Sequence, residues 1–206
     1  MTGWPPGRVV LASGNAGKLA EIRALLAGSG IELVPQSDFD VPEVEETGTT
    51  FVENAIIKAR HAAGYAGLPA IADDSGLEVD ALGGAPGVRS ARFAGPDADD
   101  AANNRLLLER LSGLTAAQRS ARFRCVMVFL PHPASPAPVI REATWEGRIG
   151  EAPRGENGFG YDPLFLPAGE AGTLAELPPE KKNRLSHRGQ ALRALIETLT
   201  GPPPPR

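Results

Sequence analysis

The sequence contains only one cysteine, Cys125, so no disulfide bond can form within the chain. This cysteine lies in the apolar run 123–130, which favours a buried thiol over a catalytic nucleophile. No group of cysteines and histidines has the spacing of a zinc site. A long apolar run is also missing, because the stretch 9–12 is too short for a membrane span or a signal peptide. We therefore expect a cytoplasmic protein that does not insert into membranes.

An excess of positive charge is absent too, since the formal net charge is −4. Proteins that bind mainly to nucleic acid are usually basic, so we expect no nucleic-acid partner. A small anionic ligand is not excluded, because it needs only local positive charge. The 206 residues, 42% of them hydrophobic, are enough for a sizeable core in one domain or in two small lobes.

Apolar runs alternate with segments of helical periodicity along the chain. Strands are predicted at residues 9–12, 31–34, 70–72, 122–130 and 139–149, with 77–79 as a continuation of the third. Helices are predicted after the turn at 13–18, from about Thr50, over 97–111 and over 186–200. The last two strands are expected to form a hairpin through the proline-rich loop 131–138. This order favours an α/β fold with a mixed twisted sheet flanked by helices on both faces.

The turn at residues 13–18 joins a predicted strand to a predicted helix and is rich in small residues. A helix N-terminus exposes unpaired N–H groups and the positive end of the helix dipole, which suit a phosphate. Lys18 adds a full charge, and Ser13 and Asn15 can donate hydrogen bonds. The spacing is not that of a Walker A loop. On its own this turn is more typical of an ordinary helix cap followed by an exposed lysine.

Two adjacent carboxylates, Asp73 and Asp74, follow the predicted strand 70–72. Buried carboxylates are costly unless they are paired or bind a metal, and a strand end in an α/β sheet is a favoured place for a ligand. Mg²⁺ prefers a few carboxylates together with phosphate oxygens and water. Glu45 or Glu46, in the acidic loop 35–48, is a candidate for a further ligand. A turn with solvated acids is an equally good interpretation of this motif alone.

A third group of residues is suited to a nucleobase. Phe159 or Tyr161 can stack on a base, and Asp162 can contact its edge. The basic stretch 181–189 contributes Lys182, His187 and Arg188. Ser186 is predicted as the N-cap of the last helix, so His187 and Arg188 would oppose the helix dipole, which hints at an anion or a carbonyl opposite them. A packed aromatic turn and a solvated basic face are the plainer alternatives.

Taken together, these motifs resemble those of the HAM1/RdgB family, which are inosine/xanthosine triphosphate pyrophosphatases acting on noncanonical purine nucleotides. Six motifs occur in order between Val9 and Leu199: Ser13-x-Asn15-x-x-Lys18, residues 46–55, residues 72–77, residues 83–87, Phe159-Gly160-Tyr161-Asp162-Pro163 and Ser186-His187-Arg188-Gly189. Six collinear motifs are far more specific than any single one.

The resemblance implies one pyrophosphatase domain of two lobes over residues 8–200, with a nucleotide cleft between the lobes and flexible termini at 1–7 and 201–206. It also implies a homodimer that uses Mg²⁺ to hydrolyse inosine, deoxyinosine and xanthosine triphosphates to the monophosphate and pyrophosphate. Attack at the α-phosphorus then releases the pyrophosphate.

The resemblance also implies a role for each matching residue. The triphosphate would be held by Ser13, Gly14, Asn15, Ala16, Gly17 and Lys18. Asp74 would be the proton acceptor and a metal ligand, and Ser75 would touch the substrate. Phe159 would stack on the purine, Gly160, Tyr161 and Asp162 would complete that wall, and Lys182, His187 and Arg188 would contact the base or the adjoining phosphate. We favour Glu46 over Glu45 as the second metal ligand because it directly precedes Thr47-Gly48, and Asp73 is a third candidate.

Base selection is expected to depend on position 6 of the purine. A donor such as Arg188 or Lys182 favours the 6-carbonyl of hypoxanthine and xanthine over the 6-amino group of adenine. Two alternatives stay open at this point. One is a related pyrophosphatase that acts on modified pyrimidine triphosphates, and the other is a nucleotide-binding or RNA-binding module without catalysis.

Overall fold

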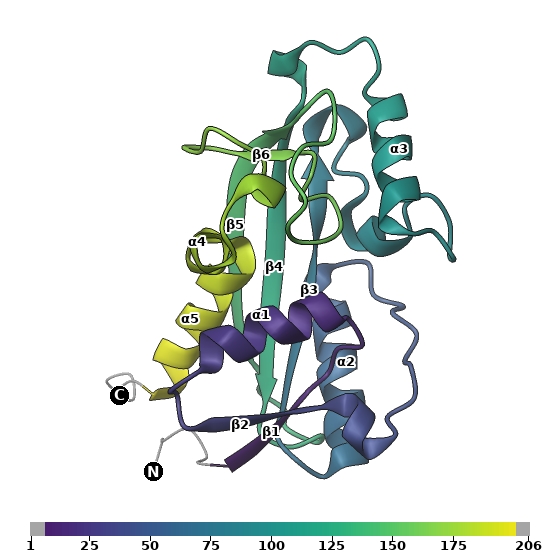
Figure 1. Cartoon of the computed structure of the whole chain (residues 1–206). Helices are drawn as coiled ribbons and strands as arrows, with labels where there is room; N and C mark the ends of the chain where they lie inside the picture. The colour runs from purple at the N-terminus through teal and green to yellow at the C-terminus, as the bar shows by residue number, and fades with distance from the viewer. Residues whose placement is uncertain (1–6, 201–206) are drawn as a thin grey trace. The chain divides into compact units, whose positions relative to one another are not determined.

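The structure, a computed structural model, describes residues 7–200, which divide into two compact units (Figure 1). The first unit comprises residues 7–74, 126–142 and 188–200, and the second comprises 75–125 and 143–187. The termini predicted to be flexible lie outside the described residues, except for Gly7. That residue begins a strand and pairs with Ile31, so the prediction was wrong for it.

Six strands form one mixed sheet in the order β2-β1-β3-β4-β5-β6. Their bounds are β1 Gly7–Leu11, β2 Ile31–Pro35, β3 Ala70–Val79, β4 Ser120–Leu130, β5 Val139–Ile149 and β6 Phe165–Pro167. Strand β1 runs parallel to both β2 and β3, whereas β6 is antiparallel to β5. Strands β4 and β5 are neighbours joined by residues 131–138, a connection too short for a parallel crossover, so they form the predicted hairpin. The predicted α/β class with a mixed sheet is confirmed.

Five α-helices accompany these strands in the described part of the chain. They are α1 Ala16–Leu26, α2 Phe51–Ala66, α3 Asp100–Arg110, α4 Pro179–Leu185 and α5 His187–Thr200. Four of them were predicted, but α4 was taken for a basic stretch because its sequence is mostly charged and shows no apolar periodicity. Among residues 7–200, no helix has the length and hydropathy that a membrane span requires.

Side-chain caps set the starts of the helices that carry the site. Thr50 caps α2 by accepting a hydrogen bond from Glu53 N at 3.2 Å, and Glu53 Oε2 accepts one from Thr50 N at 2.9 Å. This is the capping box predicted from the sequence. Asn15 caps α1 by accepting from Lys18 N at 2.9 Å, which places Lys18 in the first turn of that helix.

Each unit has its own hydrophobic interior. In the first unit, residues 9–11 of β1 and 70–72 of β3 are fully buried, and α2 contributes a row of alanines that lets the helix approach the strands closely. In the second unit, the core is formed by the following buried residues: Leu77, Val79, Leu107, Leu111, Ala121, Phe123, Trp145, Ile149, Tyr161, Leu164, Phe165, Leu174 and Leu177. Helix α3 enters this core through Leu107, whereas the neighbouring Leu106 is only half buried.

We predict that Leu107→Ala lowers the free energy of unfolding by about 2–5 kcal/mol, because it removes a fully buried side chain and leaves a cavity. Leu106→Ala is the matched control, since it makes the same change one residue earlier on the more exposed side of α3 and is expected to cost less than about 1 kcal/mol. Urea denaturation of both variants measures the difference. Equal losses would mean that α3 does not pack through Leu107.

Candidate active site

Asp73 and Asp74 lie in the middle of β3, which continues without a break to Val79. The expectation that they mark the end of a strand was therefore wrong. Successive side chains of a strand point to opposite faces of the sheet. Helices α1 and α5 lie on one face of the first unit and α2 lies on the other (Figure 1). The two neighbouring carboxylates consequently meet different helices.

The turn between β1 and α1 caps the helix as predicted, but Lys18 is half buried and paired rather than the exposed lysine of an ordinary cap. Ser13 Oγ accepts a hydrogen bond from Asn15 N at 3.2 Å, and Asn15 Oδ1 caps Lys18 N. The caps use these two oxygens as acceptors, so the Ser13 hydroxyl hydrogen and the Asn15 amide hydrogens are the groups that could donate to an anion. The Lys18 ammonium, in the first turn, lies 2.9 Å from Asp73 Oδ2.

Asp73 lies at the centre of a cluster of positive charges. Besides Lys18, it meets the guanidinium of Arg188, whose Nε lies 3.4 Å from Asp73 Oδ2. Arg188 begins α5, is almost fully buried and also forms an ion pair with Glu21 of α1. Burial by itself would raise the pKa of Asp73, but the charges of Lys18, Arg188 and Lys58 hold that pKa well below its usual range. Asp73 is therefore ionised and gathers two cations at this face.

Asp74 faces α2 on the other side of the strand. Its Oδ1 lies 2.7 Å from Lys58 Nζ, and its Oδ2 accepts a hydrogen bond from Asn54 Nδ2 at 3.4 Å. Burial raises the pKa of Asp74, and the charge of Lys58 opposes this rise. Burial would lower the pKa of Lys58, but Asp74, Asp73 and Glu46 raise it, so the ammonium is charged. Both oxygens of Asp74 thus have set partners.

Lys58 also joins Asp74 to the acidic loop, because its ammonium lies 3.1 Å from Glu46 Oε1. The carboxylates of Glu46 and Asp74 therefore converge on one point that already holds a positive charge. Glu45, by contrast, is exposed. In the described part of the chain, no group of three or more histidines, cysteines or acids is arranged to hold a metal by itself. A pair of carboxylates fits Mg²⁺, which takes its other ligands from phosphate and water.

Asn54 and Lys58 are site residues that the sequence reasoning missed. They are four residues apart on α2, a spacing that places both side chains on one face of a helix. Gly48 in turn orients Asn54, because its N–H donates to Asn54 Oδ1 at 2.8 Å. The signal that could have found them was the scarcity of lysine, together with the motif 46–55 that surrounds Asn54.

The second unit brings together the residues that were predicted to hold a base. Asp162 Oδ2 accepts hydrogen bonds from Phe159 N at 2.9 Å and from Lys182 Nζ at 2.6 Å. The Lys182 ammonium also lies 4.7 Å from the centre of the Phe159 ring. Asp162 and Lys182 are both buried, whereas Phe159 is half buried. The Phe159 ring and the buried Asp162–Lys182 ion pair therefore form one connected group of side chains.

Two other predicted base contacts are engaged in the interior of this unit. Tyr161 belongs to the core, and its hydroxyl donates to the carbonyl of Ser90 at 2.8 Å. Of the two aromatic candidates, Phe159 is thus the one at the surface. The ring of His187 is buried and stacks on Phe123, with centroids 4.7 Å apart and planes 5° apart. Ser75 follows Asp74 in β3 and is half buried.

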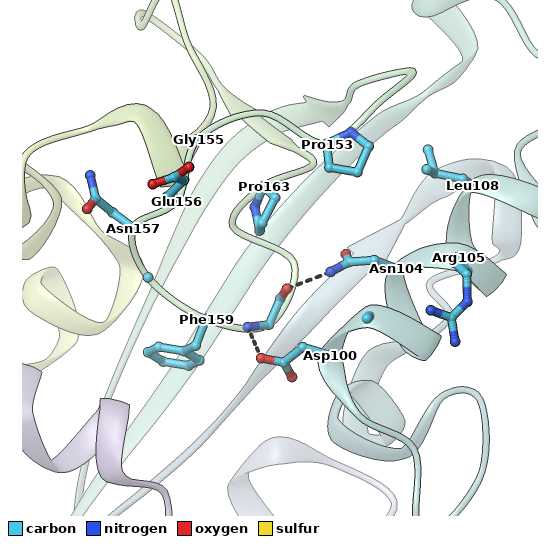
Figure 2. Close-up of a pocket in the computed structure, with 13 residues that line it drawn as sticks. Asp100, Asn104, Arg105, Leu108, Pro153, Gly155, Glu156, Asn157, Phe159 and Pro163 are labelled. Atoms are coloured by element: carbon cyan, nitrogen blue, oxygen red, sulfur yellow. Dashed lines mark hydrogen bonds between the residues drawn. The ribbon is translucent and has the colours of Figure 1, made fainter.

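A pocket of about 460 Å³ lies between α3 and the loop that carries Phe159 (Figure 2). Its wall on the helix side includes Asp100, Asn104 and Arg105, and its wall on the loop side includes Glu156 and Phe159. All of these residues belong to the second unit. The loop that carries Phe159 consequently lies opposite α3 across this pocket and is hydrogen-bonded to that helix.

The structure thus collects the predicted residues into two groups. Lys18, Glu46, Asp74 and Arg188 lie together in the first unit, around the middle of β3. Phe159, Gly160, Asp162 and Lys182 lie together in the second. The first group holds cations and carboxylates suited to a phosphate chain, and the second holds an aromatic ring beside polar groups. The α/β fold and these two groups define a protein of the nucleotide-binding class.

Comparison with known proteins gives the family. The model of the Ham1 family matches residues 9–198, so this chain belongs to the Ham1 family. A dITP/XTP pyrophosphatase of Thioalkalivibrio sulfidiphilus is 62% identical over 195 residues, which cover 94% of this chain and 99% of that protein. A dITP/XTP pyrophosphatase of Methylococcus capsulatus is 60% identical over 197 residues, covering 94% and 98%. The solved structure of a HAM1 protein from Coxiella burnetii superposes with a TM-score of 0.86 at 53% identity, covering 93% and 98%. The predicted family is therefore confirmed.

We predict that Gly48→Ala destabilises the protein by about 1–3 kcal/mol, because the added methyl group would lie 2.6 Å from Asn54 Oδ1 and force this side chain away. The control is Gly64→Ala in α2, where the added methyl group meets no atom within 4 Å. Alanine favours a helix interior over glycine, so this control is expected to gain about 0.5–1 kcal/mol. Thermal denaturation followed by circular dichroism shows whether each variant is less or more stable than the wild type. A stabilised Gly48→Ala variant would show that no close approach exists at residue 48.

Proposed function

We propose that this protein hydrolyses the triphosphates of deaminated purines, namely ITP, dITP and XTP, to the nucleoside monophosphate and pyrophosphate with the help of Mg²⁺. The observation that carries this proposal is the arrangement on β3, where Asp73 gathers two cations and Asp74 meets Glu46 through Lys58. The relatives that are named dITP/XTP pyrophosphatases support the same reaction. Removal of such nucleotides would cleanse the nucleotide pool.

The triphosphate would bind at the start of α1. The unpaired N–H groups of that helix and the Lys18 ammonium both attract phosphate oxygens. Arg188, which is held beside Lys18 through Asp73, brings a second cation to the same place. This position favours a phosphate contact for Arg188 over a base contact. These cations would offset the negative charge that grows on the leaving pyrophosphate.

Asp74 would orient the attacking water and accept its proton. Its oxygens are held by Lys58 and Asn54, so the carboxylate has one orientation. Because burial raises the pKa of Asp74, the carboxylate is a stronger base than an exposed aspartate. No covalent intermediate is needed, since a water molecule can attack the α-phosphorus directly.

Asp74 and Glu46 would also hold the Mg²⁺ ion, whose role when bound is to neutralise phosphate charge. Lys58 stands between the same two carboxylates and would keep them together when they bind no metal. This contact is the reason to prefer Glu46 to Glu45 as the second ligand. The set of two carboxylates leaves coordination positions for substrate oxygens and water.

The purine would stack on Phe159 in the second unit. Lys182 donates one hydrogen bond to Asp162, and an ammonium group has three hydrogens, so it can also donate to a 6-carbonyl. Adenine presents an amino group at that position and would leave this donor without an acceptor. Lys182 is therefore our candidate for the residue that selects deaminated bases.

Three expectations stay predictions: the homodimer implied by the resemblance, and the cytoplasmic location and the absence of a nucleic-acid partner inferred from the composition. The expected substrate contacts of four further residues also stay predictions: Gly14, Ala16, Gly17 and Ser75. The ring of His187 is buried and stacks on Phe123. This supports a structural role for His187 in the wall of the base site, rather than contact with the base through a freely rotating side chain.

We expect purified protein with Mg²⁺ to release pyrophosphate from ITP, dITP and XTP, and to act poorly on ATP, GTP and modified pyrimidine triphosphates. Ion chromatography separates pyrophosphate from orthophosphate. Asp74→Asn is expected to lose about 10²–10⁴-fold in kcat, because the general base is removed while the shape of the side chain is kept. Its circular dichroism spectrum should match that of the wild type. Orthophosphate as the product, or near-normal turnover by Asp74→Asn, would contradict the proposal.

We also expect Glu46→Gln to need about tenfold more Mg²⁺ for half-maximal activity, because one carboxylate ligand is lost. Glu45→Gln is the matched control, since it removes the same charge from the next residue of the same loop. A titration of activity against Mg²⁺ concentration compares the two. An equal shift in both variants would assign the effect to the charge of the loop, and a shift in Glu45→Gln alone would make Glu45 the ligand.

A further inference from the structure

Helix α3 holds the backbone of Gly160 at both its N–H and its carbonyl. Its N–H donates to Asp100 Oδ2 at 2.6 Å, and its carbonyl accepts from Asn104 Nδ2 at 2.9 Å. Figure 2 shows both hydrogen bonds reaching the loop from the same helix. Asp100 and Asn104 are four residues apart, so they lie on one face of α3. The backbone N–H and the backbone carbonyl of one loop residue are thus both satisfied by the same helix.

Helix α3 is itself firmly anchored at this end. The Asp99 side chain caps it by accepting from Ala102 N at 2.6 Å. Asn103 is buried and connects the helix to the segment before it, donating to Ala91 O at 3.1 Å and accepting from Ala94 N at 2.8 Å. Asn104 is buried as well. The support for Gly160 therefore comes from a fixed part of the second unit.

The Gly160 peptide lies between the two groups that are suited to hold a base. Phe159 precedes it, and Asp162 follows it and accepts from Phe159 N at 2.9 Å. Gly160 has a φ of +62°, a conformation that glycine adopts without strain. A change in the backbone at Gly160 would move the Phe159 ring relative to Asp162, the partner of Lys182. The two hydrogen bonds from α3 oppose such a change, because they hold the peptide groups on both sides of the Gly160 Cα.

We propose that Asp100 and Asn104 are positioning residues that determine base selectivity by fixing the Phe159–Asp162 turn. This inference rests on the proposed function and adds to it two residues that need not touch the substrate. The phosphate-binding group around β3 lies in the other unit and involves neither residue. We call the two hydrogen bonds from Asp100 and Asn104 to Gly160 the clamp. Loss of the clamp therefore affects binding of the base and leaves binding of pyrophosphate unchanged.

Three variants test this role. Asp100→Ala removes an acceptor from an exposed side chain, so it is expected to fold normally. Asn104→Asp keeps the shape of the side chain but sets a carboxylate oxygen against the Gly160 carbonyl. Arg105→Ala is the control, since Arg105 lines the same pocket and, within residues 7–200, shows no hydrogen bond to the Gly160 peptide. Asp100→Asn, which retains an acceptor, is expected to recover most of the wild-type behaviour.

The measurements are KM and kcat for ITP and ATP, and the calorimetric Kd of inosine monophosphate and of pyrophosphate. Asp100→Ala and Asn104→Asp are expected to raise KM for ITP and Kd for inosine monophosphate about tenfold, since a hydrogen bond that involves a charged group holds the turn. The ratio of kcat/KM for ITP over ATP falls, while kcat for ITP and the Kd of pyrophosphate change less than about twofold.

Wild-type affinities and an unchanged ITP/ATP ratio in both variants would overturn the inference. A uniform loss for every nucleotide and for pyrophosphate would do the same, because it would show a general structural defect. A wild-type protein that binds inosine monophosphate but releases no pyrophosphate would overturn the proposed function alone. The Kd values of inosine monophosphate and pyrophosphate in the variants would still decide the role of the clamp. A wild-type protein that does not bind inosine monophosphate would overturn both.

Discussion

Two buried carboxylates that are neighbours in the chain, Asp73 and Asp74, each need a compensating charge, and the first unit is organised around this need. An unpaired buried carboxylate would cost several kcal/mol, so neither could persist alone in β3. The alternation of the strand sends Asp73 to Lys18 and Arg188, and Asp74 to Lys58. The positions of α1, α2 and α5 thus follow from charge compensation as much as from apolar packing. The proposed phosphate-binding group and the proposed metal-binding pair would thus depend on the same two residues.

Opposite pKa shifts give these identical side chains different chemistry. Asp73, surrounded by cations, is held as a permanent anion that can organise Lys18 and Arg188 but is a poor base. Asp74, where burial outweighs the charges of Lys58 and Lys18, has a raised pKa and is the better proton acceptor. Titratable neighbours whose environments push their pKa values apart are a general sign of acid–base sites. In the proposed reaction, the pair would therefore separate substrate binding from catalysis within two residues.

Local patterns predicted the α/β class, the β4–β5 hairpin and the caps of α1 and α2, because these features depend on short-range periodicity and capping. They failed where distant contacts decide. Asp, Ser and Gly are poor strand formers, so the pattern ended the strand at residue 72, whereas β3 lies between β1 and β4 in the sheet and continues to Val79. Likewise, no local signal shows that Tyr161 is buried, that Asn54 and Lys58 face Asp74, or that α3 holds Gly160.

The chain boundary between the two units falls inside β3, β4 and β5, so the first unit is assembled from three separate stretches of sequence. A ribosome delivers Asp73 early, yet Arg188 emerges only near the end of synthesis. Until then the carboxylate lacks one of its two counter-charges, and the nascent chain cannot close this part of its interior. A product that ended before α5 would therefore lack Arg188, one of the two cations that compensate Asp73, and would leave this buried carboxylate partly uncompensated. Incompletely folded fragments of this kind are expected to be ready substrates for proteolysis.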